Sequence, residues 1–374
     1  MHRRIAGRAD GRAKKWLYLC FIFLAVALPL VATHLATKGA GPAAVLAPLS
    51  MLAGVAVLTN VQSGKNRHGK FTKHGLEGIV GKDGIVIATQ SVEEIDDAIN
   101  TFMGRGERVI GLNGGDGTIQ RVVSRLYNTY GEERDNLPII FPMRGGTMNA
   151  IADNFKIKGT PDKLCRRVVE LEDSGRQPSY HALNTIRIER TTSEGSAVEY
   201  GFLYGNGALY RFHRLYYEET EGGPVAAVQL LLRCLGAGIA HKTRYKDVLG
   251  GQTPMKVRID GKEMIADEFT IVLAMQFKNL LLSFSPFREG EGDFYVIAAS
   301  VPLAKMATKL HKLFWAREGQ PLPLPEEHFY NSKAKVLEIE TCEGHTFDGE
   351  VYALEEPHTL RITKGPKVKI LKFD

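Results

Sequence analysis

The chemistry of this chain is predicted from the turn Gly114–Thr118, which has the sequence GGDGT and follows an apolar run at residues 107–113. Glycine has no Cβ atom, so backbone N–H groups in such a turn can approach phosphate oxygens closely. A helix that starts directly after the turn would direct its N-terminus at the same anion, and Asp116 adds a carboxylate for a magnesium ion or an acceptor hydroxyl. A tight turn whose aspartate caps the helix is the plainer alternative, but this combination at a strand end favours a phosphate-binding loop.

Two further polar turns accompany this one. Residues 60–65 follow the apolar run at 54–59, and a turn at Gly145 follows the run at 137–141. Ligands of parallel sheets bind at the carboxyl ends of the strands. Because all three turns fall at such ends, the sequence predicts that they line one cleft.

The elements that must position these turns alternate between strands and helices. Apolar, β-branched runs predict strands at residues 54–59, 85–89, 107–113 and 137–141, and helical spacing of apolar residues predicts helices at 92–103, 119–130, 147–155 and 160–171. Strands that alternate with helices over short connections indicate an α/β domain with a doubly wound, mainly parallel sheet.

From about residue 179 the pattern changes to consecutive strands. They are predicted at residues 182–190, 198–204, 255–260, 269–275, 294–299, 335–341 and 359–363, with helices only at 224–235 and 302–315. Consecutive strands joined by turns indicate an antiparallel β-rich domain. We therefore expect a basic, apolar N-terminus at 1–50, an α/β nucleotide-binding domain at 51–178, and a β-rich substrate domain at 179–374 whose last strands pack back toward the first domain.

Composition is that of a folded protein with an anionic partner. The 374 residues are 44% hydrophobic and 24% charged, and the formal net charge is +6. A basic balance suits a nucleotide or a phospholipid surface. The charges are scattered and form no basic stripe with interleaved aromatics, so a nucleic-acid partner is not expected. The four cysteines are widely spaced and indicate neither a disulfide framework nor a zinc site.

The three turns resemble the nucleotide motifs of the diacylglycerol kinase catalytic family, which also includes sphingosine and ceramide kinases. Residues 60–64 are similar to the first motif of the family, residues 114–118 to the central motif, and residues 142–149 to the third. The sequence Asp-Gly-Glu at 348–350 resembles the motif whose glutamate serves as proton acceptor. These motifs follow one another in the order of the family, and the resemblance covers most of the chain from residue 55 onward.

The resemblance implies ATP and Mg²⁺ as cofactors and gives roles to individual residues. The catalytic residues would be Asp116 and Glu350, with Asp116 also beside the catalytic magnesium. A structural magnesium would lie at Glu291 and Asp293. The implied ATP-binding residues are Asn60, Ser63, Gly64, Lys65, Thr89, Gly114, Gly115, Gly117, Thr118, Gly145, Gly146, Thr147 and Asn149.

Three places depart from the family pattern. Val61 stands where a proline is usual, Gln120-Arg121 where the family often has Asn-Glu, and Ala150 where an aspartate commonly follows the asparagine of the third motif. Asp153 would lie on the same helix face as that asparagine, four residues after it, and is the candidate to substitute for the missing carboxylate.

The N-terminus holds a candidate membrane segment. Residues 2–15 are rich in Arg and Lys and precede an uncharged run at 16–33, which with residues 35 and 36 reaches the roughly 20 apolar residues of a spanning helix. A secretory signal, or a true start at Met51, is the alternative. The positive-inside rule would place the remainder of a single-span protein outside the cell, where ATP is scarce. A hairpin or an interfacial helix avoids this conflict, so we expect membrane association with the catalytic domain facing the cytoplasm.

We therefore expect an ATP- and Mg²⁺-dependent lipid kinase that phosphorylates a hydroxyl of a membrane lipid, diacylglycerol first and a sphingoid base or other lipid alcohol next. The apolar stretches 225–235 and 280–287 are candidates to meet the lipid, although core packing is the commoner role of such runs. One alternative is a soluble kinase similar to NAD kinase or phosphofructokinase, and another is a membrane-tethered lipid-binding protein with a decayed site. The expected partners are the lipid substrate and a membrane surface, and a homodimer is left open.

Overall fold

The structure is a computed structural model, and it describes residues 55–68, 73–220, 223–240, 243–279, 285–301, 324–325 and 327–373. The apolar helix predicted within residues 1–50 and the helix predicted at 302–315 lie outside these ranges. In the described ranges, no helix is both long and apolar enough to cross a membrane.

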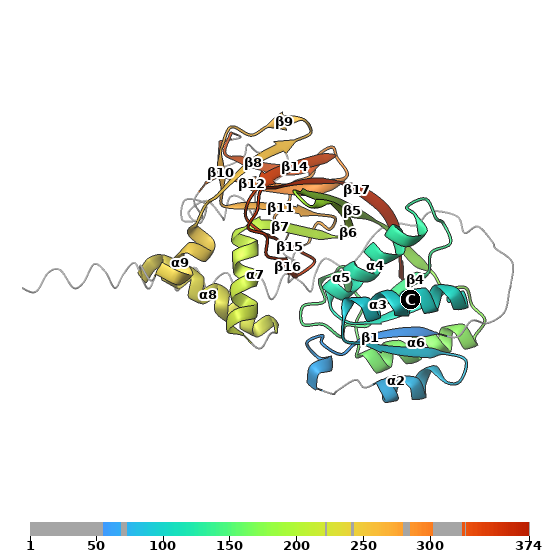
Figure 1. Ribbon diagram of the computed structural model, residues 1–374. Helices are drawn as coiled ribbons and strands as arrows, with labels where there is room; N and C mark the ends of the chain where they lie inside the picture. Colours follow the sequence, from blue (N-terminus) through green and yellow to red (C-terminus); the bar gives the residue numbers. More distant parts are fainter. Residues whose placement is uncertain are drawn as a thin grey trace, which may run out of the picture. The chain divides into compact units, whose positions relative to one another are not determined.

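The first part of the fold is a parallel sheet with helices packed against it (Figure 1). Its strands pair in the order β4-β3-β1-β2, and each of these pairings is parallel. The strands are β1 (Ala56–Asn60), β2 (Ile85–Thr89), β3 (Val109–Asn113) and β4 (Ile139–Pro142). The helices are α2 (Lys73–Val80), α3 (Val92–Arg105), α4 (Asp116–Tyr130), α5 (Ala150–Asn154) and α6 (Pro161–Asp173), and η2 (Asn66–His68) is a 3-10 turn. The predicted α/β fold with a mainly parallel sheet is confirmed.

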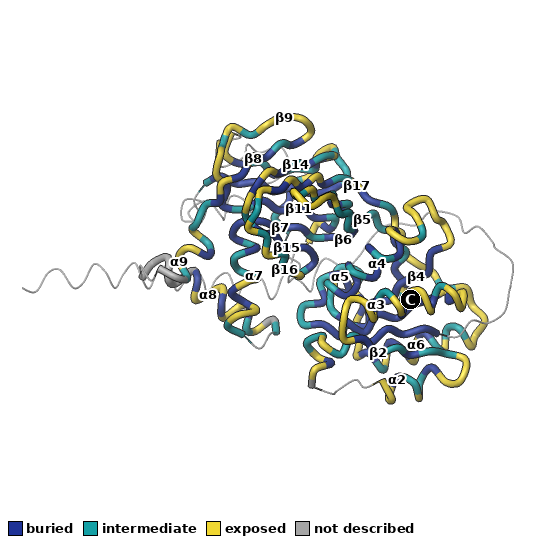
Figure 2. Tube along the Cα trace, in the orientation of Figure 1, coloured by how far each residue is buried: buried dark blue, intermediate teal, exposed yellow. Residues whose placement is uncertain are grey.

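Different helices bury the two faces of this sheet, because side chains alternate along a strand. Leu58 and Ile110 pack with residues of α3 and α4, whereas Val57 and Val109 pack with residues of α2 and α6. Figure 2 shows β1, β3 and β4 buried along nearly their whole length and the edge strand β2 only partly buried, while the helices keep an exposed side. Strands that are buried on both faces form nearly continuous apolar runs, and this is why the sequence located them well.

The β-rich part consists of two antiparallel layers. In the described chain, one layer continues the first sheet in the order β10-β8-β14-β17, with β5, β6 and β9 attached, and the other has the order β13-β12-β11-β7-β15-β16. The strands are β5 (Tyr180–Thr192), β6 (Gly195–Gly201), β7 (Leu203–Gly207), β8 (Thr253–Ile259), β9 (Lys262–Glu263), β10 (Glu268–Phe269), β11 (Ile271–Met275), β12 (Phe294–Ala299), β13 (Phe329–Ala334), β14 (Val336–Thr341), β15 (His345–Phe347), β16 (Glu350–Tyr352) and β17 (His358–Leu371). Val257 and Leu337 of one layer pack in the same core as Val272 and Val296 of the other. The predicted antiparallel, β-rich second part is confirmed.

Strand β17 joins the two parts. It pairs antiparallel with β14 and with β5, and near its end Ile370 pairs parallel with Ile140 of β4. Its register with β5 shifts between Lys364 and Lys367, a bulge of the kind that bends a strand. The parallel and the antiparallel strands consequently belong to one continuous sheet.

Three helices follow β7 and pack together: α7 (Ala208–Glu219), α8 (Pro224–Ala240) and α9 (Thr243–Gly250). Their shared core includes Leu215, Leu230 and Val248. The sequence located α8 but missed α7 and α9. Tyrosine and phenylalanine occupy four of the twelve positions of α7, and such aromatic residues are also enriched in strands, so this segment has no clear helical signal between the strands around it.

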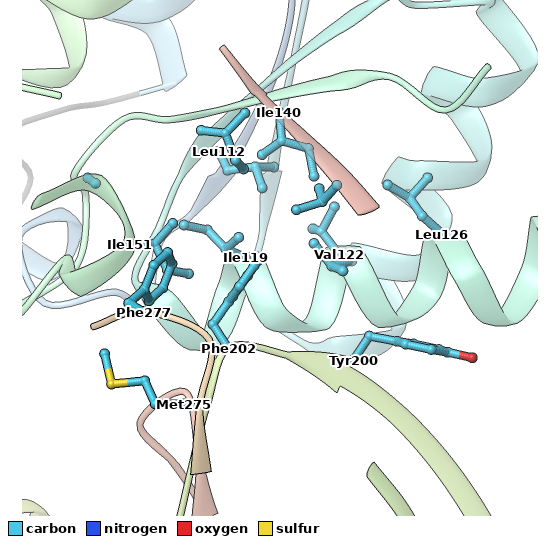
Figure 3. Close-up of a cluster of buried hydrophobic side chains, with 14 of the residues drawn as sticks. Leu112, Ile119, Val122, Leu126, Ile140, Ile151, Tyr200, Phe202, Met275 and Phe277 are labelled. Atoms are coloured by element: carbon cyan, nitrogen blue, oxygen red, sulfur yellow. The ribbon is translucent and has the colours of Figure 1, made fainter. Parts of the chain in front are cut away.

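Phe202 holds the β-rich layers against α4. Its ring is fully buried between β6 and β7, stacks on Phe277 with 5.5 Å between the ring centroids, and shares a core with Ile119 of α4 (Figure 3). Ser124 of α4 adds two hydrogen bonds, since its hydroxyl accepts from the N–H of Tyr200 at 2.8 Å and donates to the carbonyl of Tyr200 at 3.1 Å. The helix that begins with the GGDGT turn is thereby fixed to the second part of the fold.

Candidate active site

The three polar turns meet at the carboxyl ends of β1, β3 and β4, as predicted. The Asn60 side-chain amide donates to the Thr118 hydroxyl at 2.9 Å. The Ser63 hydroxyl accepts the N–H of Gly115 at 3.2 Å, and the N–H of Lys65 donates to the carbonyl of Gly145 at 3.1 Å. Each turn is therefore bonded directly to another.

Asn66 is a residue of this network that the sequence analysis missed. Its side-chain amide donates to the carbonyls of Asn60 and Asn113, both at 2.8 Å, so one side chain joins the ends of β1 and β3. The signal in the sequence was only an asparagine a few residues after the first motif, and a polar loop residue of this kind has no periodicity to reveal it.

Glycine is required where these turns touch. A Cβ atom on Gly146 would overlap the backbone of Gly115, one on Gly64 would overlap the Thr147 hydroxyl, and one on Gly114 would overlap the Thr118 side chain. Gly146 and Gly115 are in backbone-to-backbone contact, whereas Gly64 and Gly114 leave room for threonine side chains.

Asn149 closes the third turn. Its backbone has a positive φ of 56°. Its amide oxygen accepts the N–H of Gly146 at 3.1 Å, while its amide nitrogen donates to the carbonyl of the same glycine at 2.9 Å. Asparagine tolerates this left-handed conformation better than most residues, which explains its presence here.

Asp116 binds the start of α5. Its two carboxylate oxygens accept the N–H groups of Ala150 and Ile151 at 2.9 and 3.0 Å. Burial raises the pKa of Asp116, and these hydrogen bonds oppose the shift because they favour the ionised form. Ala150 contributes its backbone N–H to the site, a bond that does not depend on the side chain at this position.

Two of the backbone donors expected at the phosphates are used inside the protein, namely those of Gly115 and Gly146. The N–H groups of residues 116–118 remain, since the first turn of α4 has no earlier acceptors within the helix. Lys65 adds a cation at this edge: its ammonium donates to the Arg144 carbonyl at 3.1 Å, and burial together with the Arg144 charge lowers its pKa.

Two buried polar side chains lie beneath the turns with no protein partner. Thr89 is fully buried at the end of β2, where the resemblance expected it to contact the nucleotide, and Asn113 is fully buried at the end of β3. Within the described chain, neither the Thr89 hydroxyl nor either polar atom of the Asn113 amide has a hydrogen-bond partner. Buried polar atoms of this kind are normally satisfied by water or ligand, so both fit a polar ligand at this edge.

Glu350 reaches the same place from the other end of the sequence. Asp348 and Gly349 form the two-residue turn between β15 and β16, with positive φ angles of 47° and 86°. The Asp348 carboxylate accepts the N–H groups of Phe202 and Leu203 at 2.9 and 2.8 Å, and burial raises its pKa well above its usual range. The Glu350 carboxyl lies against Gly117, where a Cβ atom would overlap it.

Glu350 and Asp116, the two residues to which the resemblance gives catalytic roles, are therefore neighbours of the same helix turn. Burial raises the pKa of Glu350, and the positive charge of Arg121 opposes this shift. A carboxylate with a raised pKa beside a phosphate-binding turn is suited to accept a proton near neutral pH.

Gln120 and Arg121, one of the three departures from the family pattern, form a polar cluster with Glu199 of β6. Gln120 donates to the Glu199 carboxylate at 3.5 Å and to the Ser124 hydroxyl at 3.2 Å, and Arg121 pairs with Glu199 at 4.0 Å. The Tyr352 hydroxyl donates to the same carboxylate at 2.7 Å. Gln120 and Arg121 thus connect α4 to β6 and β16, the strand that carries Glu350.

Among the described residues, the other candidate carboxylates are paired or exposed and are not grouped around a metal site. Asp153 is exposed and pairs with Arg144, and Asp293 pairs with Lys364 at 3.0 Å. Glu291 is exposed. In the part of the chain that the structure describes, no three His, Cys, Asp or Glu side chains are grouped to hold a metal. The structural magnesium at Glu291 and Asp293 stays a prediction.

Comparisons with known proteins agree with this geometry. Residues 54–175 match the family described as diacylglycerol kinase catalytic domain, and this range contains all three nucleotide turns. Two crystal structures from Bacillus anthracis str. Sterne have a similar fold. A candidate diacylglycerol kinase has a TM-score of 0.55 and 15% identity over 87% of this chain and 99% of that chain. A diacylglycerol kinase has a TM-score of 0.50 and 13% identity over 87% of this chain and 98% of that chain.

Yeast NADH kinase complexed with NADH has a TM-score of 0.40 and 10% identity over 87% of this chain and 84% of that chain, which is too low to carry an argument. No curated protein sequence matches the chain. At these identities the similarity to solved structures shows the fold.

The contact between Gly117 and Glu350 generates a test that separates binding from chemistry. In Gly117→Ala, the new Cβ would displace the Glu350 carboxyl, so we expect phosphoryl transfer to fall roughly tenfold to a hundredfold, and calorimetry with ATP measures how much of this loss is weaker binding at the turn itself. Gly104→Ala is the control, because a Cβ there meets nothing within 4 Å. A Gly117→Ala variant with normal turnover would show that Glu350 does not need its observed place.

Proposed function

We propose that this chain transfers the terminal phosphoryl group of ATP to a hydroxyl of a membrane lipid. The premise is that residues 54–175 match the diacylglycerol kinase catalytic domain, so the chain is a kinase. Diacylglycerol is the first acceptor to test, and a sphingoid base or another lipid alcohol is the next. The observation that carries this proposal is the Glu350 carboxyl held against Gly117, at the first turn of the helix that begins with the nucleotide motif.

The residues of the site have separate tasks in this reaction. The N–H groups at residues 116–118 and the Lys65 ammonium bind and orient the phosphates. Glu350 accepts the proton of the lipid hydroxyl as its oxygen bonds to phosphorus and the bond from phosphorus to the leaving ADP oxygen breaks. Phosphoryl transfer depends mainly on such positioning and on neutralising charge.

A magnesium ion fits the residues that are present. Each carboxylate oxygen of Asp116 accepts one backbone N–H, and a carboxylate oxygen has two lone pairs, so acceptor capacity remains for a cation. When bound with ATP, Mg²⁺ would neutralise phosphate charge, and Asp116 is the residue of the site that would hold it.

The lipid character of the acceptor is supported by α8. Its inner side, with Ala227, Leu230 and Cys234, is buried in the core that α8 shares with α7 and α9. Its outer side exposes an apolar stripe with helical spacing, formed by Val225, Val228 and Leu232 with Leu231 beside it, whose exposed fractions are 70%, 38%, 45% and 41%. An exposed apolar stripe of this kind is suited to a membrane surface.

Helix α7 links this stripe to the catalytic hairpin. It packs with α8 in one core, and its Tyr217 hydroxyl donates to the Gly349 carbonyl at 2.8 Å. Docking of α8 on a membrane would therefore bring the lipid surface close to Glu350. The proposed location is the cytoplasmic side of a membrane, where ATP is available.

The proposed activity is tested with the purified full-length protein, Mg²⁺, labelled ATP and mixed micelles that contain diacylglycerol. We expect labelled phosphatidic acid, and roughly a hundredfold or greater loss of turnover in Glu350→Gln, which cannot accept a proton, with ATP binding retained. Glu340→Gln, an exposed glutamate on β14, is the control. Parallel reactions with a sphingoid base and with NAD⁺ identify the acceptor, and phosphorylation of NAD⁺ alone would contradict the proposal.

A pH profile tests the role of Glu350 as the base. The positive charge of Arg121 favours the ionised glutamate, so Arg121→Gln should raise the pKa of Glu350 further. The acid limb of kcat/KM should then move to higher pH, because more hydroxide is needed to ionise the base. Arg125→Gln is the matched control, since Arg125 lies one turn along α4 and pairs with Asp96 instead. An acid limb that stays in place, or moves to lower pH, would remove Glu350 as the titrating group.

Membrane docking by α8 is tested with vesicles and charged variants. Val225→Glu and Leu232→Glu should each weaken co-sedimentation with mixed neutral and anionic vesicles roughly tenfold, because the apolar burial of one side chain is lost. Ile265→Glu adds the same charge at another exposed aliphatic residue, which is 74% exposed in the connection between β9 and β10. Equal vesicle binding by all three variants would exclude α8 as the docking surface.

A further inference from the structure

Glu350 has little to hold it in place through its own side chain. Among the described residues, its carboxyl makes no hydrogen bond and no ion pair, although it lies against Gly117 and within the field of Arg121. Its location is consequently set by the backbone of the turn that precedes it, Asp348 and Gly349. Any residue that fixes this turn also fixes the carboxylate.

The turn is held from two sides. On one side, the Asp348 carboxylate accepts the N–H groups of Phe202 and Leu203, which anchors the turn to the junction of β6 and β7. On the other side, the Tyr217 hydroxyl donates to the carbonyl of Gly349 at 2.8 Å, one residue before Glu350. The first anchor is buried and comes from the junction of β6 and β7, while the second comes from α7.

Helix α7 is attached to the hairpin at a second point. The His213 ring nitrogen Nδ1 and the Thr346 hydroxyl lie 2.9 Å apart, and His213 is one helical turn before Tyr217. The two rings are 6.4 Å apart between centroids, so both side chains leave the same face of α7 and meet β15 and the turn after it. This arrangement keeps the Tyr217 hydroxyl directed at Gly349.

The Tyr217 hydroxyl remains a donor at working pH. Burial of the hydroxyl raises its pKa to about 12, and the charge of Glu350 contributes to the same shift. The residue as a whole is nevertheless 58% exposed, so its ring borders the solvent next to the catalytic carboxylate. Because most of this residue is exposed, core packing does not explain a tyrosine at this position.

We infer that Tyr217 is a positioning residue for Glu350: through its hydrogen bond to Gly349 it holds the turn that aims the carboxylate at the acceptor hydroxyl. This inference rests on the proposed role of Glu350 as the base. It adds to the site a residue from α7, an element that lies outside the nucleotide motifs.

The test compares tyrosine hydroxyls that make the same kind of bond. In Tyr217→Phe the ring stays and only the hydrogen bond is lost, so kcat should fall roughly three- to tenfold, the range expected for one such bond, while KM for ATP stays unchanged. Tyr330→Phe is the matched control, because the Tyr330 hydroxyl also donates to a backbone carbonyl, that of Lys333, at 2.7 Å in β13. Its kcat should equal that of the wild type.

Tyr217→Ala gives a second, independent readout. Removing the ring admits water to Glu350, which lowers the raised pKa of that carboxyl, so the acid limb of the rate profile should move to lower pH. Tyr217→Phe keeps the ring and should leave the limb in place. A purely structural role for Tyr217 would change stability without this difference between the two variants.

Hydrogen exchange separates this inference from the proposed function. The peptide that contains residues 345–352 should exchange faster in Tyr217→Phe than in Tyr330→Phe, whether or not a lipid is phosphorylated. Wild-type kcat in Tyr217→Phe, or equal exchange in the two variants, would overturn the positioning role. A wild-type protein that phosphorylates no lipid would instead contradict the proposed function, and exchange would still decide whether Tyr217 holds the turn.

Discussion

The site depends on one strand, β17, that belongs to both halves of the sheet. Its pairing with β14 and β5 is antiparallel, whereas its end pairs parallel with β4. Because β17 is hydrogen-bonded to strands of both halves, the β-rich layers cannot turn freely about the parallel sheet. Contacts of Phe202 and Ser124 with α4 and its surroundings restrict the same movement. The hairpin that carries Glu350 is thereby kept over the first turn of α4.

Two buried carboxylates then define the local geometry. Asp116 accepts two backbone N–H groups from the start of α5. Asp348 accepts two backbone N–H groups from the junction of β6 and β7. Burial raises the pKa of both side chains, so their ionised forms cost folding free energy. Hydrogen bonds to charged groups contribute about 1.5–3 kcal/mol each and offset that cost. Removing either carboxylate would leave a pair of buried N–H groups without acceptors.

The carboxyl ends of β1, β2 and β3 carry buried polar side chains whose hydrogen-bonding capacity is not filled by the described residues. Thr59 and Asn113 are neighbours in register on β1 and β3, and Thr89 lies opposite Asn60 on β2. Thr59, Thr89 and Asn113 are all buried, and each has a side-chain polar atom with no hydrogen-bond partner among the described residues. Most buried polar groups in proteins are paired. A polar ligand at the carboxyl ends of these strands would explain why this group of side chains is kept.

The sequence by itself determined the parallel sheet, the order of its elements, and the turns that meet at its edge. Continuous apolar runs and glycine-rich turns are local signals, and β2 and β12 were predicted with their observed bounds. The roles of Asp116 and Glu350 were predicted only through the resemblance to a family, because no local property of a turn acid identifies a base.

Only the tertiary structure decided how the site is completed. Asn66 and Tyr217 owe their roles to hydrogen bonds with residues far away in the chain, and Asn113 owes its role to burial at the end of β3 without a hydrogen-bond partner among the described residues. Ala150 reads as a loss in the sequence, yet its backbone N–H binds Asp116. The sequence gives the identity of each side chain, whereas packing sets how closely two backbone segments approach. This site depends largely on such close approaches.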